Sequence, residues 1–193
     1  MNLVALVLAA GSATRFGSDK LSALLDGEPL LFHAVRAARA APVSRVILVA
    51  RPGLETGTWP AGPPVDVLRI ASNALSASLK AGIAAAQGAD GAFVFLADMP
   101  RVPHDEAARL AGLIGGNYAA LPRYEGRGGH PVLLSSRAFP DIAALDGDEG
   151  AGRLLRSRED VVFDECADPA IHLDVDRPED LGRLARRRRP GEH

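Results

Sequence analysis

The sequence has little cysteine, few lysines and no long apolar run. Cys166 is the single cysteine among 193 residues, so the chain cannot form an internal disulfide or a cysteine-built metal site. No apolar run approaches the roughly 20 residues that a membrane helix needs, and a net charge of −2 does not suggest a nucleic-acid groove. The first apolar run follows no basic region or cleavage site, so we expect no signal peptide. A cytoplasmic protein that binds neither membranes nor nucleic acids is therefore expected.

The remaining pattern predicts one α/β domain at residues 1–185, followed by a basic tail at 186–193. Short β-branched runs alternate with Ala- and Leu-rich segments of helical period, which is typical of a mostly parallel sheet covered on both faces. The expected strands are 3–8, 45–50, 65–70, 92–96, 118–121, 132–134, 160–163 and 171–175. The expected helices are 30–40, 76–87, 103–114, 150–156 and 178–188.

A loop of small residues follows the first expected strand. From Leu8 to Lys20 the sequence is LAAGSATRFGSDK. Small residues let backbone N–H groups approach a phosphate closely, and Arg15 and Lys20 could neutralise its charge. The spacing fits neither a Walker loop nor a GxGxxG dinucleotide fingerprint. The loop therefore indicates a phosphate site of another kind.

Lys20 is notable because the chain has only two lysines, Lys20 and Lys80, among its 22 basic residues. Since the chain otherwise uses arginine for positive charge, a lysine at the end of a glycine loop indicates a need for a compact ammonium group. The alternative is that Lys20 is an ordinary surface charge before a short strand.

An aspartate follows the apolar run at 92–96. Asp98 comes two residues after this run, and Pro100 prevents a helix from beginning at once. In open α/β sheets ligands bind at the carboxyl ends of the strands. A carboxylate in that place suits a hard cation such as Mg²⁺. The alternative is that Asp98 caps a helix or a turn.

A second acidic group lies at residues 173–181, which read LDVDRPEDL. Alternation along an extended strand would put Asp174 and Asp176 on the same face. Pro178 then opens the last expected helix, with acidic residues in its first turn. Asp176 is therefore a candidate metal ligand, a candidate helix cap, or both.

Two glycine-rich segments contain candidate substrate-binding residues. In 126–134, His130 could bind a phosphate or a ring edge, or it could serve as a structural hydrogen-bond partner. The segment 147–155 contains Asp148 and Arg153 and is typical of a turn that leads into a helix, where its amides and Arg153 could bind an anion.

A serine-rich segment at 76–82 opens another expected helix. It contains Ser78, a candidate nucleotide ligand, and the second lysine. The alternative is an N-cap serine followed by a solvated lysine.

Together these segments resemble the molybdenum cofactor cytidylyltransferases, a branch of the nucleotidyltransferase group that also includes the guanylyltransferases of this cofactor. The resemblance extends from Leu3 to about Leu184, and the segments occur in the same order. The glycine loop alone identifies only the superfamily. The combination that points to the cytidylyl branch is GHPV at 129–132, GDEGA at 147–151 and DVDRPED at 174–180.

This resemblance implies a Rossmann-like three-layer fold and a Mg²⁺-dependent transfer of CMP from CTP to the phosphate of molybdopterin, with release of pyrophosphate. Arg15 and Lys20 would be catalytic, and Asp98 and Asp176 would bind the metal. The nucleotide would be bound by Leu8, Ala9, Ala10, Gly11, Ser12, Ala13, Lys20, Ser78 and Asp98. The molybdopterin-type cofactor would be bound by His130, Asp148 and Arg153.

A recipient molybdoenzyme is a further candidate partner, and we expect a monomer or a weak dimer. The reaction would be a direct in-line attack, because no Ser-His-Asp or Cys-His set offers a nucleophile. Ala10 favours CTP over GTP as the donor. The guanylyl branch has LAGG at this place, and the methyl group of Ala10 would crowd a purine. One methyl group is worth about 1–3 kcal/mol in a pocket.

The chain also departs from the family pattern. Gly152 stands where the family usually has Arg, with Arg153 one place on, so the contact to the acceptor phosphate is relocated or lost. Phe16 replaces a usual Met, Leu24 a usual Pro, and residues 72–75 also differ. These changes concern the acceptor more than nucleotidyl transfer itself.

Three other functions are therefore considered. GTP could be the donor, or another small phosphate compound the acceptor. Either change keeps the same chemistry, and a carrier that binds the molybdenum cofactor without catalysis is the second, but it would need neither Arg15 and Lys20 nor Asp98 and Asp176. An NAD(P)-linked oxidoreductase is excluded by the missing dinucleotide fingerprint.

Overall fold

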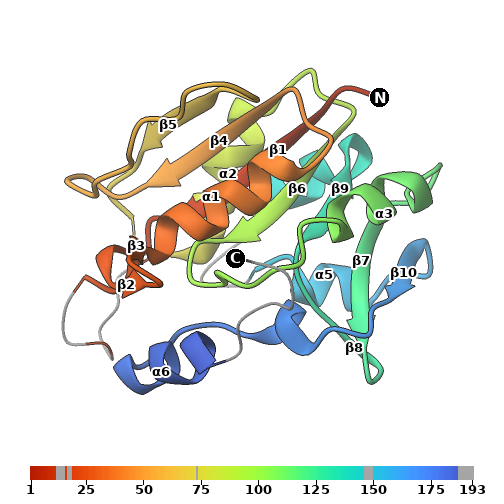
Figure 1. Cartoon of the computed structure of the whole chain (residues 1–193). Helices are drawn as coiled ribbons and strands as arrows, with labels where there is room; N and C mark the ends of the chain where they lie inside the picture. Colours follow the sequence, from red (N-terminus) through yellow and green to blue (C-terminus); the bar gives the residue numbers. More distant parts are fainter. Residues whose placement is uncertain (12–15, 17–18, 73, 146–149, 187–193) are drawn as a thin grey trace.

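The computed structural model contains a mixed α/β fold built on one continuous sheet (Figure 1). It describes all residues except 12–15, 17–18, 73, 146–149 and 187–193. The strand order is β10-β7-β9-β6-β1-β4-β5, and the short β8 pairs with β7. Only β9 and β8 run antiparallel to their neighbours in this described sheet. The predicted mostly parallel sheet is therefore confirmed.

The elements agree with the sequence pattern to within a few residues. The strands of the sheet are β1 (Leu3–Ala9), β4 (Arg45–Ala50), β5 (Val65–Arg69), β6 (Gly91–Leu96), β7 (Ala119–Tyr124), β8 (Arg127–Gly128), β9 (Val132–Ser135) and β10 (Val161–Glu165). A small hairpin pairs β2 (Leu24–Leu25) with β3 (Glu28–Pro29). The helices are α1 (Leu30–Ala40), α2 (Leu75–Ala85), α3 (Glu106–Leu113), α4 (Phe139–Ala143), α5 (Gly152–Arg156) and α6 (Pro178–Arg186).

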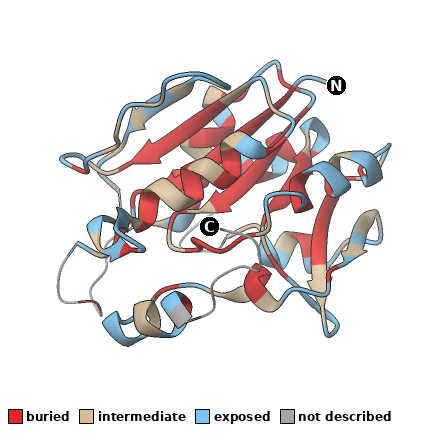
Figure 2. Ribbon diagram, viewed as in Figure 1, coloured by how far each residue is buried: buried red, intermediate tan, exposed pale blue. Residues whose placement is uncertain are grey.

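Two apolar layers enclose the sheet, and β1 contributes to both. Its residues Leu3, Ala5 and Val7 pack with α1 and α3 on one face. Its residues Val4 and Leu6 pack with α2 and α4 on the other. Every residue of β1 is buried, so the apolar run reflects a strand that is covered on both sides. Figure 2 shows the buried central strands between exposed outer helix faces.

The chain reverses its direction across the sheet at β1. It passes from β1 to β4 and β5 on one side and then returns through α2 to β6 on the other side. In open α/β sheets such a reversal leaves a crevice outside the carboxyl ends of the strands. The fold therefore places a binding crevice at the ends of β1 and β6.

The C-terminal segment differs from the sequence prediction. Instead of a strand at 171–175, the chain forms a 3-10 turn η3 (Pro169–His172) and then an irregular stretch. The Asp168 carboxylate accepts a hydrogen bond from the Ala170 N–H and starts the turn. The Val175 N–H then donates to a loop carbonyl and not to a strand. The strand alternation inferred for Asp174 and Asp176 is therefore wrong.

Two other features complete this comparison. The short helix α4 was not predicted, because five residues that begin with Phe139 and Pro140 carry almost no periodic signal. The residues of the predicted basic tail after Arg186 lie outside the described part. No helix among the described residues is long and apolar enough to cross a membrane.

The packing predicts opposite effects for two glycine-to-alanine changes. A Cβ on Gly91 would lie 2.8 Å from the backbone oxygen of Leu134, so Gly91→Ala must separate β6 from β9. A Cβ on Gly112, in α3, would meet nothing within 4 Å. In urea unfolding, Gly91→Ala should lower the free energy of unfolding by about 1–3 kcal/mol, and Gly112→Ala should raise it by about 0.5–1 kcal/mol. Equal midpoints for the two variants would contradict this packing.

Candidate active site

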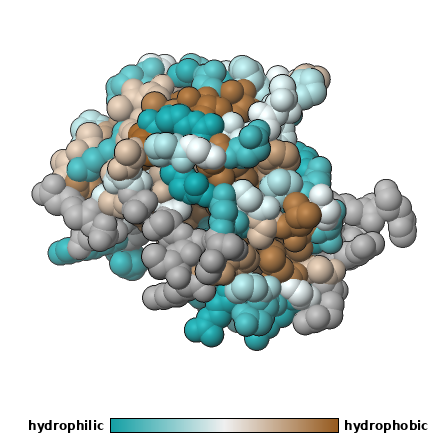
Figure 3. Space-filling model, turned by 90° about the vertical axis from the view of Figure 1, so that its left-hand side faces the viewer, coloured by the Kyte–Doolittle hydropathy of each residue, from teal (hydrophilic) through white to brown (hydrophobic). Residues whose placement is uncertain are grey.

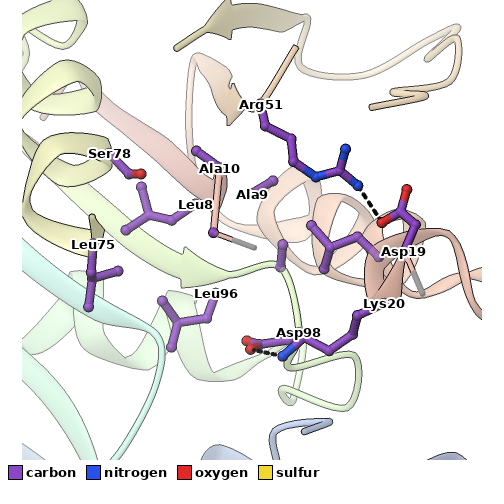
Figure 4. Close-up of a pocket in the computed structure, with 13 residues that line it drawn as sticks. Leu8, Ala9, Ala10, Asp19, Lys20, Arg51, Leu75, Ser78, Leu96 and Asp98 are labelled. Atoms are coloured by element: carbon purple, nitrogen blue, oxygen red, sulfur yellow. Dashed lines mark hydrogen bonds and ion pairs between the residues drawn. The ribbon is translucent and has the colours of Figure 1, made fainter. Parts of the chain in front are cut away.

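A cavity of about 620 Å³ opens at the carboxyl ends of β1 and β6 (Figure 4). The residues that follow β1, namely Ala10 and Gly11, form one part of its wall. The end of β6 and the residues after it, Leu96 to Asp98, form another. The cavity thus occupies the crevice that the sheet topology creates, and it contains most of the described residues that the sequence singled out.

Lys20 lies in the wall of this cavity with Asp98, and the Asp176 carboxylate approaches it from outside the lining residues. Its Nζ atom is 2.9 Å from Oδ2 of Asp98 and 3.5 Å from Oδ1 of Asp176. The side chain of Lys20 is only 14% exposed, whereas Asp98 and Asp176 are 27% and 54% exposed. The three groups come from positions far apart in the sequence. A solvated surface lysine is therefore excluded, and the structure brings together the predicted phosphate-binding lysine and both predicted metal ligands.

Backbone hydrogen bonds hold the C-terminal segment at this site. The Val175 N–H donates to the carbonyl oxygen of Asp98 at 2.9 Å. The Asp180 carboxylate accepts from the N–H groups of Asp176 and Arg177 at 3.1 and 2.9 Å. The bond from Arg177, aided by that from Asp176, holds the pKa of Asp180 below its usual range. This arrangement makes Asp180 the acceptor at the start of α6 and leaves the Asp176 carboxylate beside Lys20.

Apolar packing also holds the same segment in place. Val175 and Leu184 are buried against Leu25, Leu30 and Phe16. Phe16, which replaces the family's usual Met, is itself only 8% exposed. This small cluster joins the glycine loop, the β2–β3 hairpin and α6. The position of Asp176 therefore depends in part on the packing of Phe16, which belongs to the glycine loop.

The two carboxylates also meet the requirement for a divalent metal. Proteins usually hold Mg²⁺ through one or two carboxylates together with substrate phosphates. Asp98 and Asp176 approach one positively charged group, Lys20 Nζ, so together they favour a cation between them. Partial burial and the charges of Asp176 and Asp98 raise the pKa of Asp174. Within the described residues, no group of three or more His, Cys, Asp and Glu is placed to hold a metal alone.

A second ion pair, which the sequence did not indicate, lies in the wall of this cavity. Arg51 Nη2 lies 2.5 Å from Oδ1 of Asp19, and Figure 4 shows the two side chains pointing toward one another. Burial alone would raise the pKa of Asp19, but hydrogen bonds from Arg51 and Ser22 outweigh it and lower this pKa. The available signal was that Arg51 directly follows β4, the strand beside β1. It therefore had to reach the same sheet edge.

Small and apolar residues form the remaining wall. Leu8 and Ala10 are buried, with exposed fractions of 8% and 1%. Ser78 also lines the cavity, but its hydroxyl donates to the carbonyl of Ala74 at 3.3 Å. Leu75, which the sequence did not single out, is 43% exposed beside them. This wall is suited to a flat apolar group such as a nucleobase.

His130 lies outside this cavity, in the wall of an adjoining one. Its Nδ1 atom is 3.4 Å from the carbonyl oxygen of Val94, and its backbone N–H donates to the Ile171 carbonyl. Burial lowers the pKa of His130, so the ring is neutral at pH 7. The ring contacts the backbone, as the structural interpretation expects, and it also lines a cavity, while its role toward a substrate stays a prediction.

Other predicted site residues are not part of these contacts. Arg15, Ser12, Ala13 and Asp148 lie outside the described residues. Arg153 is on α5 and lines neither cavity.

Comparison with known proteins identifies the family. Residues 5–161 match the model of the MobA-like NTP transferase domain. The purine catabolism protein PucB of Bacillus subtilis is 30% identical over 95% of this chain and 96% of its own length. The molybdenum cofactor guanylyltransferase of Rhodobacter capsulatus is 31% identical over 98% of both chains.

Solved structures have the same architecture. Rv0371c from Mycobacterium tuberculosis H37Rv has a TM-score of 0.82 and 26% identity, over 96% of this chain and 99% of that one. A complex of Rv0371c with manganese has a TM-score of 0.78 and covers 97% of this chain and 100% of that one, again at 26% identity. The predicted nucleotidyltransferase fold is thereby confirmed. The chain belongs to the MobA-like NTP transferase domain family and is a nucleotidyltransferase.

Proposed function

We propose that this nucleotidyltransferase moves CMP from CTP to the phosphate of a molybdopterin-type cofactor, with Mg²⁺ bound and pyrophosphate released. The observation that carries this proposal is the partly buried Lys20 ammonium, which lies in the wall of the first cavity between the carboxylates of Asp98 and Asp176. A carrier protein that only binds the cofactor would not need a lysine between two carboxylates. The relative from Rhodobacter capsulatus acts, by its name, on the molybdenum cofactor, and this supports the acceptor class.

The choice of CTP rests on the base side of the cavity. Ala10 is 1% exposed and lines the cavity, so its methyl group reduces the space for a base. A pyrimidine is smaller than a purine and fits better beside it. The alternative donor is GTP, which the name of the same relative favours.

Transfer requires an acceptor phosphate oxygen to attack the α-phosphorus while the bond to the pyrophosphate oxygen breaks. The acceptor phosphate is already ionised near pH 7, so the chain need not supply a general base. Lys20 would neutralise the charge that develops on the triphosphate, and its fixed position avoids reorganisation during the reaction. Arg15 would assist, by the family resemblance.

Asp98 and Asp176 would hold Mg²⁺, which supplies charge neutralisation on the phosphates when bound. The manganese complex of Rv0371c supports a divalent ion in this family. In this chain Asp98 is held at the end of β6, and Asp176 is held by the backbone bonds around it.

Replacing Lys20 tests the mechanism. Lys20→Ala should lower kcat by on the order of 10²–10³, the scale of losing one preorganised stabilising group. Pyrophosphate release with CTP, Mg²⁺ and molybdopterin measures this. Lys80→Ala is the matched control, because Lys80 lies on α2 and lines neither cavity. Full turnover by Lys20→Ala would overturn the mechanism.

A nucleotide panel tests the donor. With ATP, CTP, GTP and UTP offered separately, CTP should give the fastest pyrophosphate release. Ala10→Gly should then increase the ratio of kcat/KM for GTP to that for CTP by about tenfold, because one methyl group is worth about 1–3 kcal/mol in a pocket. Faster release from GTP in the unmodified protein would rule out the cytidylyl assignment.

Removal of metal tests the two carboxylates. Transfer should stop when EDTA is in excess and return when Mg²⁺ is added above the chelator, since two carboxylates and the substrate phosphates must share the ion. Asp98→Asn should require a higher Mg²⁺ concentration for half-maximal rate. An unchanged rate in EDTA would contradict the role assigned to Asp98 and Asp176.

A further inference from the structure

A second cavity of about 630 Å³ adjoins the nucleotide cavity. The two share Leu8, Leu75 and Leu96 in their walls. The second extends from this boundary over the ends of β6, β7 and β9 toward α5 and β10. Figure 3 shows the side of the molecule that is on the left in Figure 1, where apolar residues, in brown, form part of the surface. If the first cavity holds the nucleotide, the second is the place for the acceptor.

The wall of this second cavity is apolar, with positive charge but no negative charge among its described residues. Leucine and valine side chains and Phe163 form most of it. The charged groups in the described wall are Arg127 and Arg156, and no Asp or Glu lines it. His130 is neutral, because burial lowers its pKa. Such a wall suits a ligand that joins a flat apolar ring to an anionic group.

Arg156 occupies the space above Gly152, where the family usually has an arginine. A Cβ built on Gly152 would lie 3.3 Å from Nη1 of Arg156. Residues four apart lie on one face of a helix, and the later side chain leans toward the N-terminal end. The guanidinium of Arg156 therefore reaches back one turn of α5 to the place that a side chain at 152 would fill.

The segment just before Gly152 contacts the boundary between the two cavities. Gly150, two residues before Gly152, packs against Leu75, since a Cβ there would be 3.0 Å from Leu75 Cδ2. Leu75 is one of the residues that the two cavities share. The Arg156 guanidinium thus lies over the first turn of α5, in the wall of the second cavity and two residues along the chain from a contact with this boundary.

We propose that Arg156 binds the phosphate of the acceptor and that the acceptor's ring system lies against the apolar wall of this second cavity. This inference rests on the proposed function. It assigns to Arg156 the contact that the loss of arginine at position 152 would otherwise remove. A guanidinium suits the task because its planar set of donors matches a phosphate with two parallel hydrogen bonds.

The test compares Arg156→Ala, Arg156→Lys and Arg153→Ala with the unmodified protein. Arg156→Ala should raise KM for molybdopterin by about 10- to 100-fold, the scale of a lost charge-assisted hydrogen bond. Affinity for CTP with Mg²⁺, measured by calorimetry, should stay within twofold. Direct binding of molybdopterin in the absence of CTP should weaken by a similar factor. Arg156→Lys should recover only part of the loss, because an ammonium cannot bond in bidentate fashion.

A relocation variant separates this contact from a general effect on folding. Gly152→Arg in the Arg156→Ala background should restore a substantial part of the molybdopterin affinity. Arg137→Ala is the surface control, because Arg137 pairs with Asp160 away from both cavities. Thermal unfolding of each variant checks the fold.

The outcomes distinguish two failures. If the unmodified protein transfers no nucleotide to molybdopterin, the proposed function fails. If it does transfer, but Arg156→Ala keeps its KM and its molybdopterin affinity, the role of Arg156 is overturned. Loss of acceptor binding in Arg153→Ala alone would return the contact to Arg153.

Discussion

The rest of the site depends on one electrostatic arrangement, the Lys20 ammonium between the carboxylates of Asp98 and Asp176. Two carboxylates near one another repel, and partial burial strengthens the repulsion because less water screens it. A cation between them removes this cost. Lysine fills the place in the structure, and under the proposed function a divalent metal ion and the substrate phosphates would lie beside it. The Lys20 charge thus offsets the repulsion between two carboxylates that the backbone hydrogen bond from Val175 to Asp98 and the packing of Val175 hold near one another.

The sheet provides the framework for this arrangement. Because β1 is buried on both faces, its end is fixed, and the loop after it begins from a rigid point. Because β6 pairs with β1 in parallel, Asp98 emerges beside that loop. Arg51 reaches the same edge from β4. The chemistry thus gathers at one edge because parallel neighbours must end there together.

Much of the framework could be predicted from the sequence. Strands such as β1, β4 and β6 are continuous apolar runs, and the pattern located them within a residue or two. Asp98 could be predicted because it closely follows the strand pattern of β6, and Lys20 because it ends the glycine loop and is one of only two lysines. Asp176 was identified from the acidic segment, but the strand invoked to orient it does not exist. Its orientation depends on hydrogen bonds from Val175 and to Asp180, which no periodicity indicates.

The second cavity was harder to predict for a related reason. Arg156 reaches the place above Gly152 because of the turn of a helix only five residues long. A family pattern is matched position by position along the chain, so the neighbouring Arg153 was predicted to bind the acceptor instead. Arg51 was missed because its partner Asp19 lies in another loop and no motif contains both. In each case the missing information was three-dimensional proximity.

The hydrogen bond from Val175 to Asp98 has a consequence for how the protein is made. Synthesis proceeds from the N-terminus, and domains acquire their structure as the chain emerges. A nascent chain that ends before residue 176 can already form β1 and β6, yet it lacks the second carboxylate and the backbone contact that fixes it. The carboxylate pair around Lys20 can therefore form only after the segment that carries Asp176 has been made. Chains cut short before residue 176 would contain the central strands of the sheet but not this pair.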